Sequence, residues 1–486
     1  MTILKDSDFT ILKRSGGYRM DLLLFSLNKE DITPLYEQLY EGIKDAIIQK
    51  KINVGEKLPS KRKLSDFLNI SQTTIELAYA QLLAEGYISA KARVGYFVED
   101  LDELPYVEKH TILPKTPTQK PTYTYDFNPS GIDIEHFPFS TWRKYARDLY
   151  DTAHADLLLT GEAQGEFALR QEIATYLYQS RGVECSPEQI VIGSGTEQLL
   201  PMLIRLFEEA TVFALEHPGY PSVDRILRQH GRSVFPINVD DEGIIVNELE
   251  KSNADVVYVT PSHQFPTGAI LSATRRTQLL NWAAASPTRY IIEDDYDSEF
   301  RYTGKPIPAL QALNGKDKVI YMSTFTKSLM PSLRLAYFVL PPSLLAIYQR
   351  VFTYYTSTVP RFDQHIVANF MRDGHFSKHL NRMRKIYRKK HNALIDAFTH
   401  YPQVRITGSQ AGMHILLALE GNEQQLWQSA KTQGIGVYPL SQYLLQPAHY
   451  ADARFLIGFG QLYDINQAVD ALMKVWQLKK ITPHSL

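Results

Sequence analysis

The hydrophobic positions that follow residue 33 are spaced as in an amphipathic helix. Apolar side chains recur one turn apart at Leu35, Leu39, Ile43 and Ile47. Proline is favoured at the first position of a helix, and the hydroxyl of Thr33 is suited to an N-cap. We therefore expect a helix that opens at Pro34 with Thr33 as its cap.

The pattern continues as two further helices and then changes to two short apolar runs typical of strands. Pro59-Ser60 is expected to begin the second helix and Ser71 to cap the third, which ends at Gly86. The buried side of the third helix is predicted to consist of Ile75, Ala78 and Leu82. Residues 87–90 and 95–98 are then expected to pair as a wing. Two short helices around a tight turn are the arrangement that places a recognition helix in the major groove of DNA.

From about Asp126 onward, short apolar runs alternate with long helical patterns. The runs that predict strands are 189–192, 212–215, 256–260, 290–293, 319–322 and 336–340. Such runs between helices indicate a mostly parallel sheet that is buried on both faces. The expected fold class is therefore α/β, preceded by a winged helix-turn-helix.

Breaks in the pattern divide the chain into parts. We expect a lead-in at 1–33, a DNA-binding domain at 34–100, a linker at 101–125 and an α/β domain at 126–486. The linker is predicted because prolines interrupt a polar stretch that has little to bury. These prolines are Pro105, Pro114, Pro117 and Pro121.

Composition indicates the compartment of the protein and how it could bind nucleic acid. The 486 residues carry a net charge of −1, so any affinity for nucleic acid must come from a local patch. Cys185 is the only cysteine, which excludes an internal disulfide and favours a reducing compartment. The charged N-terminus does not resemble a signal peptide, and no stretch approaches the roughly 20 apolar residues of a membrane helix. We expect a cytoplasmic protein.

Basic and hydroxyl side chains gather where the predicted recognition unit would meet DNA. Lys61-Arg62-Lys63 begins the second helix, and no acidic residue occurs from 57 to 65. The first turn of the third helix adds Ser71, Gln72, Thr73 and Thr74. Base edges or phosphates would lie against such a turn. The alternative for the basic cluster is a solvated helix face, but the order of helices, turn and wing favours DNA binding.

Three separated motifs in the α/β domain carry side chains suited to chemistry. Gly193-Ser194-Gly195-Thr196 follows a predicted strand and opens a helix, where free N–H groups and the helix dipole favour a phosphate. Within residues 290–297 a predicted buried strand delivers several carboxylates and a tyrosine to its carboxyl end, where open α/β sheets bind ligands. Residues 323–327 place hydroxyls directly before a lysine, and Arg334 follows seven residues later.

Each motif has a plainer alternative. The glycine turn is common at strand-to-helix junctions, the acidic run is compatible with an exposed loop, and a lone lysine is more often a surface residue. Their combination in this order favours a Schiff-base lysine with phosphate ligands beside it. A carboxylate would then hold a pyridinium nitrogen, and a tyrosine would contact the ring.

The N-terminal segment resembles the GntR-type winged helix. Residues 58–64 are similar to the LPS-x-R-x-L signature of that family, and residues 82–86 to its L-x-x-E-G ending. The resemblance implies that the DNA contacts are made by Ser60, Arg62, Ser71 and Thr73. It also implies that Gly95 shapes the wing.

The span from about Asp126 to Gln477 resembles a fold-type I aminotransferase, and the two-part layout resembles the MocR group of regulators. The resemblance implies pyridoxal 5'-phosphate (PLP) as cofactor, with Lys327 as the Schiff-base lysine and Asp294 paired with the pyridine nitrogen. The phosphate contacts that it implies are Gly195, Thr196, Thr324 and Arg334. Further candidate cofactor contacts are Tyr220, His263, Tyr296 and Thr326. A hydrogen-bonded structural role is the alternative for His263, and no metal site is predicted.

Several positions depart from the patterns of the family. Phe265 stands where aminotransferases have an asparagine that hydrogen-bonds the cofactor, and a phenyl ring donates nothing. The usual carboxylate-binding arginine position falls near Leu456, with Arg454 two residues away on the same strand face. In GABA-responsive members of the group two arginines hold the ligand carboxylate, and their positions here are Ser222 and Gln461. A carboxylate buried without a charged partner would be costly, so GABA is not expected to be the effector.

We therefore expect a transcription regulator that binds promoter DNA, senses PLP itself and controls PLP synthesis. One alternative is a regulator that senses GABA or another amino acid through an external aldimine. Another is an active aminotransferase, and a third is a DNA-binding protein with a vestigial, PLP-free domain. Residual half-transamination is compatible with a sensor.

Two further expectations concern surfaces. A homodimer is expected, although Thr160 stands where many members place a tyrosine that reaches the neighbour's phosphate. The basic stretch 378–390 is predicted to be the solvated face of a long helix, with a second DNA-contacting surface as the alternative.

Overall fold

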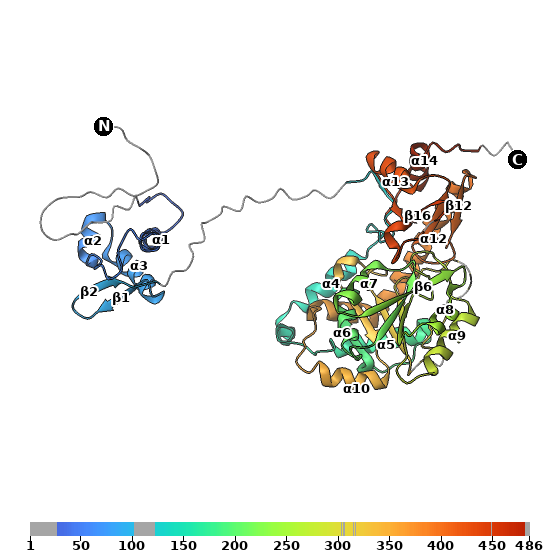
Figure 1. Ribbon diagram of the computed structural model, residues 1–486, viewed down its shortest axis with the longest axis horizontal. Helices are drawn as coiled ribbons and strands as arrows, with labels where there is room; N and C mark the ends of the chain where they lie inside the picture. The colour runs from blue at the N-terminus through green and yellow to red at the C-terminus, as the bar shows by residue number, and fades with distance from the viewer. Residues whose placement is uncertain are drawn as a thin grey trace. The chain divides into compact units, whose positions relative to one another are not determined.

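The computed structural model describes residues 27–101 and 122–481, apart from residues 303, 305, 306, 314, 316 and 449. The chain forms two compact units, Met1–Gln119 and Lys120–Leu486, which Figure 1 colours from blue to red along the chain. Most of the lead-in predicted at 1–33 and of the linker predicted at 101–125 lies outside the described residues. These two boundaries therefore stay predictions.

The N-terminal unit contains the three helices and the hairpin that its sequence pattern predicts. Its elements are α1 Leu35–Ile48, α2 Lys61–Leu68, α3 Gln72–Ala84, β1 Ile88–Lys91 and β2 Gly95–Val98. Ser60 caps α2 by accepting a hydrogen bond from the backbone N–H of Lys63. Ser71 caps α3 in the same way, from the N–H of Thr74. The strands pair antiparallel as a wing.

The start of α1 differs from the prediction by one residue. Pro34 occupies the cap position itself, with φ −58° and ψ 146°, and the helix begins at Leu35. No side chain caps α1, so Thr33 is not its N-cap. The proline ring fixes φ near this value both in the first helical turn and in extended backbone, so the sequence does not distinguish the two positions.

Helices α1 and α3 pack against each other around an apolar core. The buried side of α3 is formed by Ile75, Ala78, Tyr79 and Leu82, which confirms the predicted set and adds a tyrosine. The Tyr79 hydroxyl donates a 2.9 Å hydrogen bond to the carbonyl oxygen of Pro59. This bond ties α3 to the turn that precedes α2.

The C-terminal unit is built on an eight-stranded sheet with the order β4-β11-β10-β9-β8-β5-β6-β7. The strands are β4 Ile190–Gly193, β5 Val212–His217, β6 Ser233–Asp240, β7 Gly243–Ile244, β8 Val256–Val259, β9 Tyr290–Asp295, β10 Val319–Thr324 and β11 Ala336–Val339. Strand β11 is antiparallel to β4 and β10, and β7 to β6, whereas the other pairs are parallel. The mostly parallel sheet is confirmed.

Helices bury both faces of this sheet. They are α4 Phe139–Leu149, α5 Phe167–Arg181, α6 Thr196–Ile204, α7 Pro221–Gln229, α8 Val246–Lys251, α9 Ala273–Ala284, α10 Pro342–Val351 and α11 Arg361–Arg372, with the short 3-10 turns η1 Thr152–Leu158, η2 Pro187–Gln189 and η3 Pro331–Leu333. Successive residues of β4 enter different cores: Ile190 and Ile192 pack with α5 and α11, whereas Val191 packs with α6, α7 and α10. This alternation explains why the predicted strands have continuous apolar runs.

A smaller subdomain follows, with the antiparallel sheet order β12-β13-β16-β15. Its elements are α12 His375–Thr399, β12 Val404–Thr407, β13 His414–Leu419, α13 Glu423–Thr432, β14 Ile435–Gly436, β15 Tyr438–Pro439, η4 Leu440–Tyr443, β16 Ala453–Gly458 and α14 Ile465–Val475. In Figure 1 these orange and red elements lie to one side of the large sheet. Strand β3, Tyr125–Asp126, pairs with β14 and so joins the start of the unit to this subdomain.

Among the helices that the structure describes, none combines the length and the apolar run needed to cross a lipid bilayer.

Candidate functional site

Strand register brings the three predicted motifs together at the carboxyl ends of the parallel strands of the large sheet. Thr324 ends β10 and lies opposite Ala336, which in turn lies opposite Gly193 at the end of β4. Strand β9 runs parallel to β10, with Asp294 opposite Met322. The glycine turn, the acidic run and the lysine loop therefore leave the sheet at the same edge, at the carboxyl ends of parallel strands. Open α/β sheets bind ligands at this edge.

Lys327 is buried at this edge and is not a surface lysine. Only 8% of the residue is exposed, and its Nζ donates a 2.6 Å hydrogen bond to the carbonyl oxygen of Pro129. Burial lowers the pKa of the Lys327 amine to about 8, because the charged form loses hydration. The neutral fraction near pH 7 is therefore larger than for an exposed lysine, and the neutral amine is the nucleophile.

Asp294 is buried against Tyr258, a residue that sequence reasoning missed. The Tyr258 hydroxyl donates a hydrogen bond to the Asp294 carboxylate. Burial raises the pKa of Asp294 to about 7, and the negative charges of Asp295 and Asp297 add to the rise. No cationic side chain in the described part of the chain pairs with Asp294. A cation placed here would stabilise the carboxylate, and a protonated pyridine nitrogen is such a cation.

The rest of the acidic run is buried and paired, which excludes the exposed-loop alternative. Arg181 lies 2.7 Å from Asp295, and the Tyr321 hydroxyl donates to the same carboxylate. Glu293 accepts a 2.9 Å hydrogen bond from the backbone N–H of Leu310. Arg181 stands 114 positions before Asp295 in the chain, so no local spacing indicated this pair.

The glycine turn and the predicted arginine meet at the start of α6. Gly195 is the N-cap of α6 with φ +128°, and a Cβ at this position would collide with the Arg334 guanidinium. Thr196 is the first helical residue. Arg334 pairs with Glu197 at 2.8 Å, and both side chains are about half exposed. The N-terminus of α6 and the guanidinium together favour an anion.

Two hydroxyls of the lysine loop lie beside this anion-binding turn. Thr324 Oγ1 and Thr326 Oγ1 are 2.6 Å apart. Thr324 also donates to the carbonyl oxygen of Leu335, the residue that follows Arg334. The structure therefore places the predicted phosphate ligands of two loops next to one another.

His263 is buried between Tyr296 and Asp297. Its Nδ1 lies 3.0 Å from Asp297 Oδ2 and 3.0 Å from the Tyr296 hydroxyl, which is also 3.0 Å from the His263 carbonyl oxygen. One ring nitrogen cannot donate and accept together, so we assign the Nδ1 proton to Asp297 and the Tyr296 proton to the carbonyl. His263 therefore fills the structural role, and its contact with a cofactor stays a prediction.

A second histidine adjoins this group. The ring centroids of His263 and His414 are 4.7 Å apart. The atoms of His263, Asp297 and His414 that could bind a metal ion lie within 4.8 Å of one another. It is the one such group found among the described residues, although no metal site was predicted from sequence. The His263–Asp297 hydrogen bond accounts for the arrangement of two of its members without an ion.

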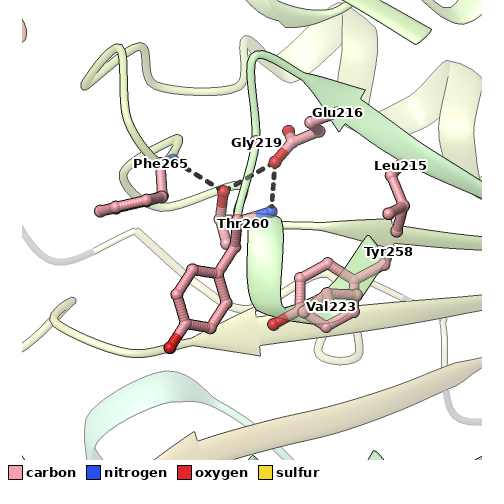
Figure 2. A pocket seen from close by; sticks show the side chains of 8 residues that line it. Leu215, Glu216, Gly219, Val223, Tyr258, Thr260 and Phe265 are labelled. Atoms are coloured by element: carbon pink, nitrogen blue, oxygen red, sulfur yellow. Dashed lines mark hydrogen bonds between the residues drawn. The ribbon is translucent and has the colours of Figure 1, made fainter. Parts of the chain in front are cut away.

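A small hollow of about 10 Å³ lies beside Tyr220, and Figure 2 shows the polar contacts at its rim. The N–H and hydroxyl of Thr260 donate to Glu216 at 3.0 and 2.7 Å, and the N–H of Phe265 donates to the Thr260 hydroxyl at 2.9 Å. Burial raises the pKa of Glu216 to about 7. This chain of hydrogen bonds fixes the loop that carries Phe265, whose ring packs edge-on against Tyr220.

The residues at the sheet edge fit PLP. The buried amine of Lys327 suits the aldehyde carbon, and the buried carboxyl of Asp294, which has no cationic partner among the described residues, suits the ring nitrogen. The donors around Gly195 and Thr324 suit the phosphate. PLP is the cofactor of this fold.

The positions of carboxylate-binding arginines hold other side chains. Leu456 is fully buried in an apolar cluster with Leu416 and Leu440. Gln461 donates a 3.1 Å hydrogen bond to the backbone carbonyl oxygen of Asp126. Neither residue offers a positive charge to a ligand.

The predicted DNA-contacting residues of the N-terminal unit differ in exposure and in their partners. Lys61 forms an ion pair with Glu76 of α3 and lies 5.8 Å above the Tyr96 ring. Arg62 and Lys63 are exposed, as are Ser71, Gln72 and Thr73 at the start of α3. The hydroxyl of Thr74 is engaged with that of Ser71 at 2.8 Å.

Gly95 begins the second strand of the wing. Its φ is +136°, and a Cβ there would lie 2.9 Å from the Lys57 Cε atom. A larger residue would therefore strain the wing through its backbone conformation, whereas the exposed Lys57 side chain can move aside.

The basic stretch 378–390 lies on α12 and is not wholly a solvated face. Lys390 pairs with Asp133 at 2.8 Å, and Arg384 donates to the carbonyl oxygen of Glu299 at 2.8 Å. The exposed members are Lys378, Arg382, Lys385, Arg388 and Lys389. The prediction of a solvated face is wrong for Arg384 and Lys390, because these two side chains reach polar groups of the packed unit.

Comparison with known proteins gives two family matches in the same order as the two units. The model of the bacterial regulatory proteins of the gntR family matches residues 35–98, and the model of aminotransferase class I and II matches residues 132–472.

Three curated relatives extend over nearly the whole chain. The uncharacterized HTH-type transcriptional regulator YdeL of Bacillus subtilis is 42% identical, and the match covers 94% of this chain and 100% of that protein. The probable rhizopine catabolism regulatory protein MocR of Rhizobium meliloti is 31% identical, covering 86% and 88%. The HTH-type pyridoxine biosynthesis transcriptional regulator PdxR of Corynebacterium glutamicum is 31% identical, covering 90% and 94%.

Among solved structures, a multiple substrate aminotransferase from Thermococcus profundus superposes with a TM-score of 0.66. It is 22% identical, and the match covers 76% of this chain and 97% of that enzyme. At this identity the likeness concerns the fold alone.

Proposed function

This chain belongs to the MocR group, in which a GntR-type DNA-binding domain precedes an aminotransferase class I and II domain, and we propose that it regulates transcription in response to PLP. The observation that supports the proposal most directly is the burial of Lys327 and Asp294 at one sheet edge in a regulator. The relative named for pyridoxine biosynthesis supports the control of PLP synthesis as the role.

Different residues at the site would contact different parts of PLP. Lys327 would provide the amine that joins the aldehyde carbon, and Asp294 would hold a proton on the ring nitrogen, with Tyr258 fixing its carboxylate. The turn at Gly195, together with Thr324 and Arg334, would bind the phosphate. When bound, PLP supplies a carbonyl carbon that reacts reversibly with amines.

Two features favour sensing over turnover. Phe265 offers no hydrogen bond in place of the expected asparagine, and the hydrogen bonds through Thr260 to Glu216 fix its loop. The position at Leu456 provides no cation for a substrate carboxylate. An amino acid substrate would therefore lack the charged partner that orients its carboxylate, and PLP would lack the asparagine hydrogen bond.

The test compares operator affinity of the apo and PLP-loaded protein, with and without GABA. DNA selected by the protein from a random library serves as the operator. A change in affinity on PLP loading that GABA does not alter supports the proposal. Equal affinities of the apo and loaded forms, together with a GABA-dependent change, would support an amino-acid sensor instead.

A second assay addresses the enzyme alternative. The PLP-loaded protein is incubated with amino acids and 2-oxoglutarate, and the oxo acid formed is counted per site. At most one equivalent per site is expected, since a single half-reaction can occur without turnover. Sustained formation would favour an aminotransferase.

We also propose that the protein acts as a homodimer. Winged helix-turn-helix proteins commonly read two half-sites whose spacing mirrors the twofold axis of the dimer. Sedimentation of the PLP-loaded protein at micromolar concentration is expected to give twice the chain mass, and a monomer under these conditions would contradict the proposal.

A further inference from the structure

A cleft that is separate from the residues proposed to hold PLP opens between the small sheet and the β6–β7 side of the large sheet. Its volume is about 670 Å³. The small sheet contributes Arg405, Ala418 and Arg454 to one wall. Asp240 and Asp241, at the turn between β6 and β7, line the other side.

Strand register places this cleft away from the cofactor residues. From the cofactor end outward, the opposed pairs on one face of β13 and β16 are His414–Gly458, Leu416–Leu456 and Ala418–Arg454. Four residues of antiparallel strand extend roughly 13 Å, so Arg454 lies that far along β16 from Gly458. The leucine pair between them belongs to an apolar cluster with Leu440 and Phe265. This cluster, whose members Leu416 and Leu440 also line the cleft, therefore lies between the cleft and the cofactor residues.

Arg454 enters this cleft without a partner for its charge. Its guanidinium lies 4.1 Å from the centroid of the Tyr450 ring, and its Nε is buried without a hydrogen-bond acceptor. No ion pair of the described residues includes it. Arg405, in the same row of the sheet, instead forms an ion pair with Asp452 and is 69% exposed. The Nε is closed to solvent, so a ligand carboxylate would pair instead with the terminal guanidinium N–H groups, which have no acid partner among the described residues.

The carboxylates around Arg454 determine which kind of anionic ligand the cleft could bind. Asp240 is paired with Arg275 at 2.6 Å, whereas Asp241 is exposed and has no ion pair among the described residues. Glu423 lies close enough to accept a hydrogen bond from the backbone N–H of Arg454. These carboxylates disfavour a phosphate dianion. A single carboxylate whose charge is balanced by an ammonium group suits a cation on one wall and acids on the other.

We propose that this cleft binds a small zwitterion of the amino acid class, with its carboxylate on Arg454 and its ammonium group toward Asp241. The ligand contacts both the small sheet and the edge of the large sheet, so its binding stabilises one arrangement of the two subdomains. The site does not require PLP to be the effector, and it differs from amine capture at Lys327.

The test uses protein in which the cofactor site cannot react. The PLP-loaded protein is reduced with borohydride, which fixes PLP on Lys327 and prevents exchange with added amines. Calorimetry then measures binding of each of the twenty protein amino acids and of the ω-amino acids from glycine to 6-aminohexanoate. Matched carboxylic acids without the amine, and amines without the carboxylate, are measured beside them.

At least one zwitterion is expected to bind the reduced protein at least tenfold more tightly than its matched acid and amine. Arg454→Gln is expected to weaken this binding at least tenfold, and Asp241→Asn to reduce the preference for the zwitterion over the acid. Lys378→Gln, on an exposed part of α12 that does not line the cleft, is the control and is expected to change affinity less than threefold. Circular dichroism and the PLP content of each variant confirm that the unit is folded.

Absence of binding by every probe overturns the proposal. Binding that Arg454→Gln leaves unchanged overturns it as well, because the ligand then lies elsewhere. Equal affinity for the zwitterion and its matched acid overturns the assignment of the acidic wall. None of these results bears on PLP-dependent DNA binding, so failure here is distinguishable from failure of the proposed function.

Discussion

Lys327 and Pro129 are 198 positions apart in the chain, yet the lysine Nζ donates a 2.6 Å hydrogen bond to the proline carbonyl oxygen. The pairing of β3, Tyr125–Asp126, with β14 of the small subdomain fixes the segment that carries Pro129. The backbone of Gly458 packs against the same segment. The environment of the reactive amine therefore depends on both subdomains.

Substitution of Lys327 by alanine is expected to abolish the visible absorbance of lysine-bound PLP while the protein remains folded. The amine is the only group at this position that can join the aldehyde carbon. Absorbance spectra of the purified variant, recorded from pH 6 to 9, check this. Lys378→Ala, on an exposed part of α12, is the control and should keep the spectrum of the unmodified protein. An unaltered spectrum in Lys327→Ala would contradict the assignment.

The rate of PLP loading is expected to rise with pH up to about 8 and then to level off. The pKa of the Lys327 amine is lowered from 10.5 to about 8, so the neutral fraction increases about tenfold per pH unit below that value and saturates above it. Stopped-flow absorbance of apo protein mixed with PLP measures the rate. Nα-acetyl-lysine in the same buffers corrects for the ionisation of PLP itself. A rise that continues to pH 10 would show that the amine is not desolvated.

Substitution of Asp294 by asparagine is expected to weaken PLP binding roughly 10- to 100-fold, because a hydrogen bond to a charged partner contributes about 1.5–3 kcal/mol. The variant can no longer hold a proton on the ring nitrogen by charge. Tyr258→Phe removes only the hydrogen bond that fixes the carboxylate, so a smaller loss is expected. Fluorescence titration of apo variants gives the affinities. The reverse order of effects would argue that Tyr258, not Asp294, contacts the ring.

Substitution of Arg62 by alanine is expected to weaken operator binding and to lower the slope of log affinity against log salt by about one unit. Arg62 is exposed and unpaired among the described residues. Lys61→Ala is expected to lower the slope less, because Glu76 already neutralises this lysine. Fluorescence anisotropy at several salt concentrations measures both. Equal slopes for the two variants would show that DNA displaces Glu76 from Lys61.

Substitution of Thr73 by alanine is expected to change sequence preference more than the salt slope. Thr73 is exposed in the first turn of the predicted recognition helix, where side chains reach base edges. Selection from a random library with each variant, followed by sequencing, measures the preference. Unchanged selected sequences would place Thr73 outside the base-reading contacts.

Local hydrophobic pattern determines much of the architecture. Leu39, Ile43 and Ile47 recur at helical spacing because one side of α1 faces the core of its unit. The apolar runs that contain Val191 and Ile292 are continuous because helices cover both faces of the sheet. Lys327 and Asp294 are recognisable as site residues because each stands at or just after the end of such a run, where the sheet edge exposes a ligand site.

Tertiary structure decided the partners of these residues. Tyr258, Pro129 and Arg181 contact the site residues from positions that no local spacing connects to them. The register of parallel strands brings distant segments together, and a sequence pattern has a range of only a few residues. The lowered pKa of Lys327 depends on this burial, and so does the raised pKa of Asp294.

The sequence by itself therefore determined which elements form and which side chains lie at the ends of the strands, because helical and strand periodicity are local properties. Only the tertiary structure decided which charges are paired. Lys61 and Lys390 each belong to a run of basic residues that looks solvated in the sequence. Each nevertheless forms an ion pair with an acid outside that run, Lys61 with Glu76 and Lys390 with Asp133. Arg454 lies near the start of the apolar strand β16 and forms no ion pair with an acid among the described residues. Pairing depends on distances in space, and these are set by packing and not by spacing along the chain.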